Sequence, residues 1–324
     1  MKVKNIIMSY ILFIATIFGI QGQSKVINIE SRRNNDKSID IIYEKSKPGS
    51  YTVMIEFTKL ENADITAYGG RSFNQKFIGT VDSNRGIVLK LRRRNPEQGI
   101  SYGYTTSYIR GKYNPKVKKD FVYTLPFKKG TRIKVKDAGN LSTKYFDSEL
   151  PDNWKSFVFR AKDSDTIVAV RKGLVIEVKD QYKLDTVSHF TSKKNQVLIE
   201  HKDGTLAIYK GFSKNGVLVK VGQTVYPQTS LGVFDAKGNK SNDNVLHFNI
   251  SYLSDIKIDG QIKKKLKDKK SRSTYLNPNF LTDDGVMKLG NKEIYTVEVN
   301  EDVIFSEFTR REKKKYKKGD LLIK

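Results

Sequence analysis

Short runs of β-branched and aromatic residues, separated by turn residues, recur along almost the whole chain and constrain its fold more than any other feature. Apolar residues do not repeat at the helical period over any long stretch. Strand-like runs divided by Gly, Pro, Asn and Asp are typical of antiparallel sheets joined by hairpins. The sequence therefore predicts an all-β protein.

The expected strands fall into two groups, which predict two domains. A β-sandwich-like domain is expected over residues 23–120, with strands at residues 39–43, 51–57, 65–68, 76–80, 87–91 and 102–109. A second, antiparallel β domain is expected over residues 121–290, with strands at residues 174–178, 197–200, 206–209, 217–221 and 246–250. Residues 291–324 are expected to add a C-terminal strand over 294–305 and a solvated basic tail.

The N-terminal segment has the pattern of a secretory signal peptide. Lys2 and Lys4 precede an apolar run over residues 6–20, and Gly22 offers a cleavage point before Gln23. The run is shorter than the ~20 residues that a transmembrane helix needs, although an uncleaved anchor is the alternative interpretation. We therefore expect a signal peptide over residues 1–22, a secreted protein, periplasmic or extracellular, and no integral membrane segment after cleavage.

The composition narrows the chemistry further. The 324 residues include 60 Lys and Arg against 35 Asp and Glu, a formal net charge of +25, so polyanions are plausible partners. The chain has no Cys, which excludes disulfides, a thiolate nucleophile and Cys-based zinc sites. Its only histidines are His189, His201 and His247, which limits His-based catalysis.

One series of motifs in the second domain resembles a known family. A Val-x-x-Gly-Gln motif at Val219-Lys220-Val221-Gly222-Gln223 is followed by Leu246-His247-Phe248, in the order of the lysostaphin-type (LytM-like) peptidoglycan endopeptidases. The resemblance covers roughly residues 123–284 and also includes residues 173–178, 197–205, 209–212, 231–232 and 275–278. It implies a compact antiparallel metallopeptidase-fold domain that holds one zinc ion, which activates water to cut cross-link peptides of the bacterial cell wall.

That chemistry needs three protein ligands for zinc, an open position for water and a nearby base. The family supplies them with four histidines and one aspartate. In this sequence no His occurs before His189, so the first metal ligand is missing, and Phe159 aligns with the ligand Asp, with a slip of one or two residues possible. Gly211 and Val245 stand where the family has its two catalytic histidines. Only His247 remains, as a remnant metal ligand.

Three functions follow from this comparison. The first is a catalytically inactive pseudo-enzyme that binds peptidoglycan stem peptides or another cell-envelope protein, with Tyr209, His247 and Asn249 as groove residues and no cofactor. The second is an active zinc endopeptidase with displaced ligands, built on His189, His201 and His247. The third is a secreted polyanion-binding protein that uses the basic runs at residues 263–272 and 310–318.

Other catalytic constellations are missing from the sequence. It contains neither a Gly-x-Ser-x-Gly elbow nor a Gly-x-x-x-x-Gly-Lys phosphate loop, so neither a serine hydrolase nor a nucleotide-binding protein is expected.

Overall fold

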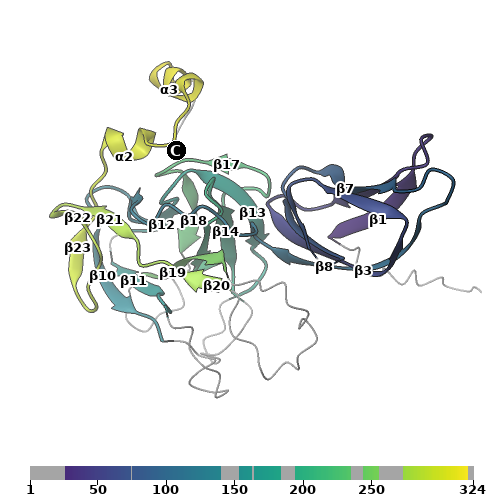
Figure 1. Cartoon of the computed structure of the whole chain (residues 1–324). Coiled ribbons are helices and arrows are strands. Elements are labelled where there is room, and N and C mark those ends of the chain that lie inside the picture. The colour runs from purple at the N-terminus through teal and green to yellow at the C-terminus, as the bar shows by residue number, and fades with distance from the viewer. Residues whose placement is uncertain are drawn as a thin grey trace, which may run out of the picture.

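The computed structural model describes residues 26–73, 75–139, 153–162, 164–183, 194–234, 244–254 and 273–319. The expected signal segment (residues 1–22), His189 and the basic run at residues 263–272 lie outside these ranges. Two β units lie side by side, and the C-terminal segment folds against the larger one (Figure 1). Within the described residues, no helix is long and apolar enough to cross a lipid bilayer.

The N-terminal unit is a sandwich of two four-stranded antiparallel sheets. Its strands are β1 (Ile27–Arg33), β2 (Ile39–Lys45), β3 (Tyr51–Glu61), β4 (Ala63–Ala67), β5 (Gly70–Phe73), β6 (Lys76–Val81), β7 (Arg85–Arg93) and β8 (Ser101–Arg110). One sheet has the order β1-β2-β7-β4 and the other β5-β6-β3-β8. Alternate residues of both sheets, such as Ile41 and Leu89 from one and Val53 and Phe77 from the other, form a shared core.

The second unit is built on one nine-stranded sheet. Its order is β17-β13-β14-β15-β19-β11-β10-β23, and β20 also pairs with β19. These strands are β10 (Arg132–Asp137), β11 (Phe157–Ala161), β13 (Gly173–Lys179), β14 (Gln196–Glu200), β15 (Leu206–Lys210), β17 (Thr224–Val225), β19 (Asn244–Leu253), β20 (Ser273–Tyr275) and β23 (Ile294–Thr296).

Two three-stranded sheets accompany the large sheet. The first consists of β12 (Thr166–Val168), β16 (Phe212–Val217) and β18 (Ser230–Phe234), and the second of β9 (Val122–Tyr123), β21 (Asn279–Thr282) and β22 (Gly285–Met287). Phe127, Phe280, Phe157 and Phe248 bring these elements and the large sheet into one apolar core. The predicted all-β class and antiparallel pairing are confirmed, with β9 and β21 as a parallel exception.

Two sequence predictions about elements are wrong. The strand expected over residues 217–221 ends at Val217, and residues 218–221 lie in a connection in which Leu218 and Val221 are exposed. The C-terminal strand expected over residues 294–305 ends at Thr296 and is followed by α2 (Glu301–Phe305) and α3 (Arg310–Lys317). Asn300 caps α2, and Thr309 with Glu312 forms a capping box on α3, so side chains satisfy the first backbone N–H groups of both helices.

Candidate functional site

The face of the large sheet that lies opposite its core carries the one motif histidine. Along β19, Leu246, Phe248 and Ile250 are fully buried, whereas Val245, His247 and Asn249 alternate with them and are half-buried. This is the period of two of a strand with one face on a core. His247, Asn249 and Val245 therefore share a face.

Two neighbouring strands determine what surrounds His247. Its partner on β11 is Val158, and its partner on β15 is Lys210. Arg160 lies opposite the neighbouring residue Val245 and on the same face. Lys194, just before β14, lies close enough for its positive charge to lower the pKa of the His247 imidazole. The nearest residues to His247 on the neighbouring strands are therefore aliphatic or cationic, with Asn249 beside it on β19 and the carboxylate of Glu177 close enough to act on Lys210.

The electrostatics follow from that arrangement. Burial, and then the positive charges of Lys194, Lys210 and Arg160, lower the pKa of His247 to about 4. Burial also lowers the pKa of Lys194. It lowers the pKa of Lys210 as well, and the positive charges of Lys194 and Lys179 lower that pKa further. His247 is therefore neutral at pH 7, in a patch that attracts anions.

These residues do not fit a catalytic zinc ion. The described residues contain no group of three His, Cys, Asp or Glu side chains that could hold a metal. Around His247, the flanking positions on β11 and β15 carry Val158 and Lys210, and the local positive charge opposes a divalent cation. No hydrolytic step through zinc can be derived from this arrangement.

The position that the sequence comparison aligned with one catalytic histidine of the family has no room for a side chain. Gly211 has φ +136°, and a Cβ atom there would lie 2.4 Å from the carbonyl oxygen of Val245. The backbones of residues 211 and 245 approach each other too closely for any other residue at 211. In the last position of β15, Lys210 faces the His247 side instead.

Two residues assigned from the sequence to this site belong to the core. Tyr209 was expected in the groove, but it is fully buried and its hydroxyl accepts a 3.0 Å hydrogen bond from the backbone N–H of Val170. Phe159 was aligned with the ligand Asp, but its ring stacks on Phe157 in the core, with 5.5 Å between the centroids. Because strand residues alternate between faces, the residues of β11 that flank the His247 face are Val158 and Arg160.

His201 cannot share a metal with His247. It lies in the turn after β14, and His247 is two strands away, near the other end of the sheet; strand spacings place the two Cα atoms roughly 19 Å apart. Its Nδ1 lies 2.9 Å from the Thr205 hydroxyl, which itself donates to Asp203. Burial and the charge of Arg171 lower the pKa of His201 to about 3, so it is a neutral core residue. A zinc site built on His189, His201 and His247 therefore loses His201 as a ligand beside His247. His189 lies outside the described residues.

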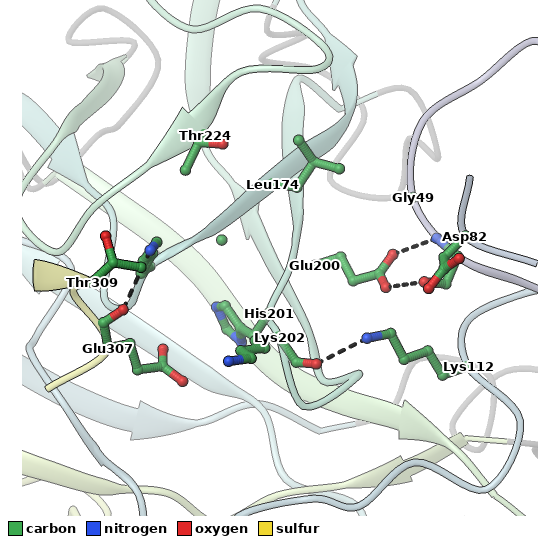
Figure 2. A pocket seen from close by; sticks show the side chains of 13 residues that line it. Gly49, Asp82, Lys112, Leu174, Glu200, His201, Lys202, Thr224, Glu307 and Thr309 are labelled. Carbon is green, nitrogen blue, oxygen red and sulfur yellow. Dashed lines mark hydrogen bonds between the residues drawn. The ribbon is translucent and has the colours of Figure 1, made fainter. Parts of the chain in front are cut away.

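A cavity of about 350 Å³ lies away from His247, where the two β units and the C-terminal segment meet (Figure 2). Ser50 and Asp82 line it from the sandwich, Glu200 and His201 from the second unit, and Glu307 and Thr309 from the C-terminal segment. Glu200 accepts hydrogen bonds from the backbone N–H and the hydroxyl of Ser50. The polar groups of this cavity thus connect parts of the chain, and none of its described lining residues comes from β19.

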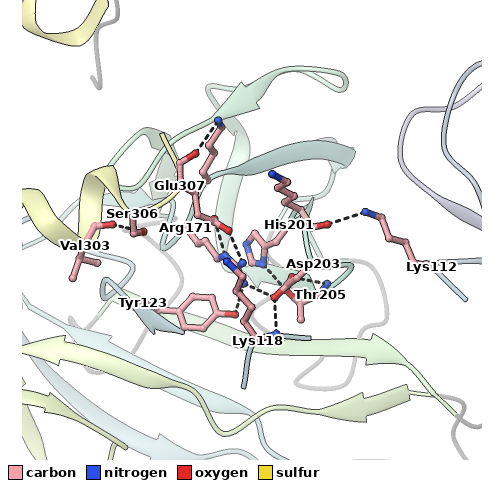
Figure 3. A network of polar contacts seen from close by, with 12 residues as sticks. Lys112, Lys118, Tyr123, Arg171, His201, Asp203, Thr205, Val303, Ser306 and Glu307 are labelled. Carbon is pink, nitrogen blue, oxygen red and sulfur yellow. Dashed lines mark hydrogen bonds and ion pairs between the residues drawn. The ribbon is translucent and has the colours of Figure 1, made fainter. Parts of the chain in front are cut away.

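A buried network of polar side chains that no sequence pattern indicated lies beside that cavity (Figure 3). The Arg171 guanidinium is fully buried and pairs with both carboxylate oxygens of Glu307, at 2.7 and 2.9 Å, and with Asp203 at 2.9 Å. It also donates to the Tyr123 hydroxyl and lies 3.7 Å from the ring centroid of Phe121. Burial opposes the charge of Arg171, but Glu307, Tyr123 and Asp203 raise its pKa above the usual value. The network joins residues more than 130 positions apart, so no local pattern could have indicated it.

Comparison with known proteins agrees with the motif resemblance. Residues 152–260 match the model of peptidase family M23. No curated protein matches the chain significantly. Among solved structures, a "putative peptidase M23" from Pseudomonas aeruginosa aligns with 14% identity over 68% of this chain and 90% of that chain, at a TM-score of 0.23. Over residues 152–260, about a third of its length, this chain is therefore similar to peptidase family M23.

Proposed function

We propose that this chain is an exported cell-envelope protein whose M23 domain binds the peptide part of peptidoglycan without cleaving it. The observation that carries the proposal is the set of side chains near His247. A zinc site would need further metal ligands there, but the nearby residues include the cations Lys194, Lys210 and Arg160. The fold of the domain does not depend on a metal, because strand pairing and a large aromatic core hold it together.

The cationic patch fits the chemistry of cell-wall peptides, which carry free carboxylates. A carboxylate is attracted to partly buried lysines more strongly than to exposed ones, because the local dielectric constant is lower. Asn249, on the same face, can accept and donate hydrogen bonds to a peptide backbone. Export is supported by the N-terminal signal pattern in the sequence.

The test combines a binding measurement with an assay of hydrolysis. Calorimetric titration of the protein with soluble stem peptides should show binding, and Lys210→Gln should weaken it roughly tenfold, the effect of ~1.4 kcal/mol. Lys220→Gln, which removes an exposed charge from a loop of the same domain, should leave the affinity unchanged. Hydrolysis of peptidoglycan by the purified protein would refute the non-catalytic role, and the same affinity in both variants would refute the His247 face as the site.

A further inference from the structure

The C-terminal helix α3 presents a continuous cationic surface. Within residues 310–318 only Glu312 and Tyr316 are partly covered, and the seven remaining residues are all exposed Lys or Arg. At 100° per residue, these seven cations spread over an arc of about 200°, centred near Lys314, while Glu312 and Tyr316 occupy the opposite side. The outward side of α3 therefore carries seven positive charges and no negative one.

Glu312, the acidic residue of α3, does not neutralise this surface, because its carboxylate contacts groups on the inward side of the helix. The Glu312 carboxylate lies 2.7 Å from Lys172 Nζ and accepts a hydrogen bond of 2.8 Å from the Tyr226 hydroxyl. It also accepts from the backbone N–H of Thr309 in the capping box. Burial opposes its ionisation, but these donors lower the pKa of Glu312 to about 2.

The body of the protein holds the helix in a fixed orientation. Phe308 packs against Tyr226 with 4.8 Å between the ring centroids, and Phe305 packs against Tyr316 at 5.0 Å. One turn before the helix, Glu307 forms the buried pair with Arg171. These aromatic side chains therefore pack inward and hold α3 to the rest of the protein. The helix itself lies at the periphery of the molecule, away from both sandwich sheets (Figure 1). A surface oriented in this way gains from binding without a large loss of conformational entropy.

We propose that α3 is a docking surface for an anionic phospholipid bilayer. The helix is only about 12 Å long, so its cationic surface is roughly as wide as it is long. A linear polyanion that crosses such a patch meets only some of its charges, whereas a bilayer presents headgroups beneath the whole arc. Clusters of four to eight cations on one side of a helix are suited to anionic lipid surfaces, at about 1 kcal/mol per residue. Because the exposed side has no large apolar residue, the contact is made with headgroups and not by insertion.

The experiment is co-sedimentation of the purified protein with vesicles of phosphatidylcholine alone and with an equimolar mixture of phosphatidylcholine and phosphatidylglycerol. The protein should bind only the anionic vesicles. The variant Lys314→Gln, Lys315→Gln, Lys317→Gln should bind them roughly a hundredfold more weakly. Gln retains the helix propensity of Lys, and circular dichroism checks that the variant is folded.

Two matched variants isolate the contribution of α3. Lys116→Gln, Lys119→Gln, Lys128→Gln removes three exposed charges elsewhere and should retain most of the affinity. Lys314→Arg, Lys315→Arg, Lys317→Arg keeps the charge and should bind like the unchanged protein. Residues 1–22 are the same in all variants, so they cannot cause a difference between them.

Three outcomes would overturn the proposal. Equal binding to both vesicle types would show that charge is not the determinant. An equal loss in the two Gln variants would show that net charge, and not α3, controls the association. Lysine-dependent binding to soluble polyphosphate without binding to vesicles would assign α3 to a polymeric anion instead of a bilayer.

Discussion

Gly211 lies where the backbone leaves no room for a side chain. The carbonyl of Val245 occupies the space that a side chain at residue 211 needs. Any side chain at residue 211 therefore requires movement of β19. The first prediction is that Gly211→Ala destabilises the protein by roughly 2–3 kcal/mol, since it adds a steric overlap to the strain of a positive φ.

Chemical denaturation measures this cost, and Gly222→Ala is the matched control. Gly222 also has a positive φ, +89°, but nothing lies within 4 Å of a Cβ atom there. The control should lose only about 1 kcal/mol, the cost of the backbone conformation. Equal losses in the two variants would contradict the close approach of residues 211 and 245.

The buried histidines make stability depend on pH. The folded-state pKa of His247, about 4, lies below the usual value of 6.5, and that of His201 is about 3. The folded protein therefore binds fewer protons than the unfolded chain between these values. The second prediction is that stability is fully present above pH 6.5 and falls as the pH drops from 6.5 towards 4, by about 1 kcal/mol per pH unit for each histidine.

Denaturation midpoints measured across this pH range test the assignment. His247→Gln removes one titrating group and should reduce the slope by about half. An unchanged slope in this variant would show that His247 is not held in its neutral form by its cationic neighbours.

At the residue scale, the alternation along β19 could be predicted from the sequence, but the surroundings of His247 could not. The motif alignment placed Gly211 and Val245 where the family has catalytic histidines, and in the structure both lie close to His247 in the strand pairing. It placed Phe159 and Tyr209 on the wrong face, because a shift of one residue along a strand reverses which side chains point to the core. Lys210 and Arg160 were missed for the same reason.

At the scale of elements, the C-terminal segment depends on one buried ion pair. Removing Glu307 leaves the fully buried Arg171 guanidinium with Asp203 as its remaining anionic partner. The loss of one member of a buried pair is costly because the other charge stays desolvated. The third prediction is that Glu307→Ala destabilises the protein by about 3 kcal/mol and releases residues 301–318 from the second β unit.

Hydrogen exchange followed by mass spectrometry tests both parts of this prediction. Amides in α2 and α3 should lose protection in Glu307→Ala, while those in β14, β15 and β19 stay protected. Glu301→Ala, which removes an exposed carboxylate from the first turn of α2, should change protection only locally. Retained protection of α3 in Glu307→Ala would show that the aromatic contacts alone hold the segment.

The strands were more predictable than the helices for a physical reason. Strands such as β3, β7 and β19 show their alternation and turn residues in the sequence itself, because one face of each packs on a core. The run that forms α3 has seven cations and is typical of a solvated tail when considered alone. Its helical conformation depends on Thr309, Glu312 and Tyr316 meeting the body of the protein, which is tertiary information.

At the scale of the whole molecule, the sandwich and the second β unit are joined by polar contacts. Glu200 accepts two hydrogen bonds from Ser50, and Arg110 pairs with Glu177 at 3.4 Å. Lys112 donates to the carbonyl oxygen of Lys202 at 2.9 Å. Each unit has its own apolar core. Units with separate cores that meet through polar groups are coupled only as strongly as those groups allow.

Glu200 and Ser50 are both buried at this interface, and the Glu200 carboxylate accepts both hydrogen bonds of the pair. The fourth prediction is that Glu200→Ala separates the unfolding of the two units, because the N–H and hydroxyl of Ser50 lose their buried acceptor. Calorimetric scans should change from one transition, or two that overlap closely, to two resolved transitions. Glu56→Gln, at an exposed position of the sandwich, should leave the scan unchanged. If Glu200→Ala instead lowers a single transition without splitting it, the units are coupled through surfaces other than Ser50 and Glu200, and the orientation of the sandwich relative to the His247 face would not depend on this pair.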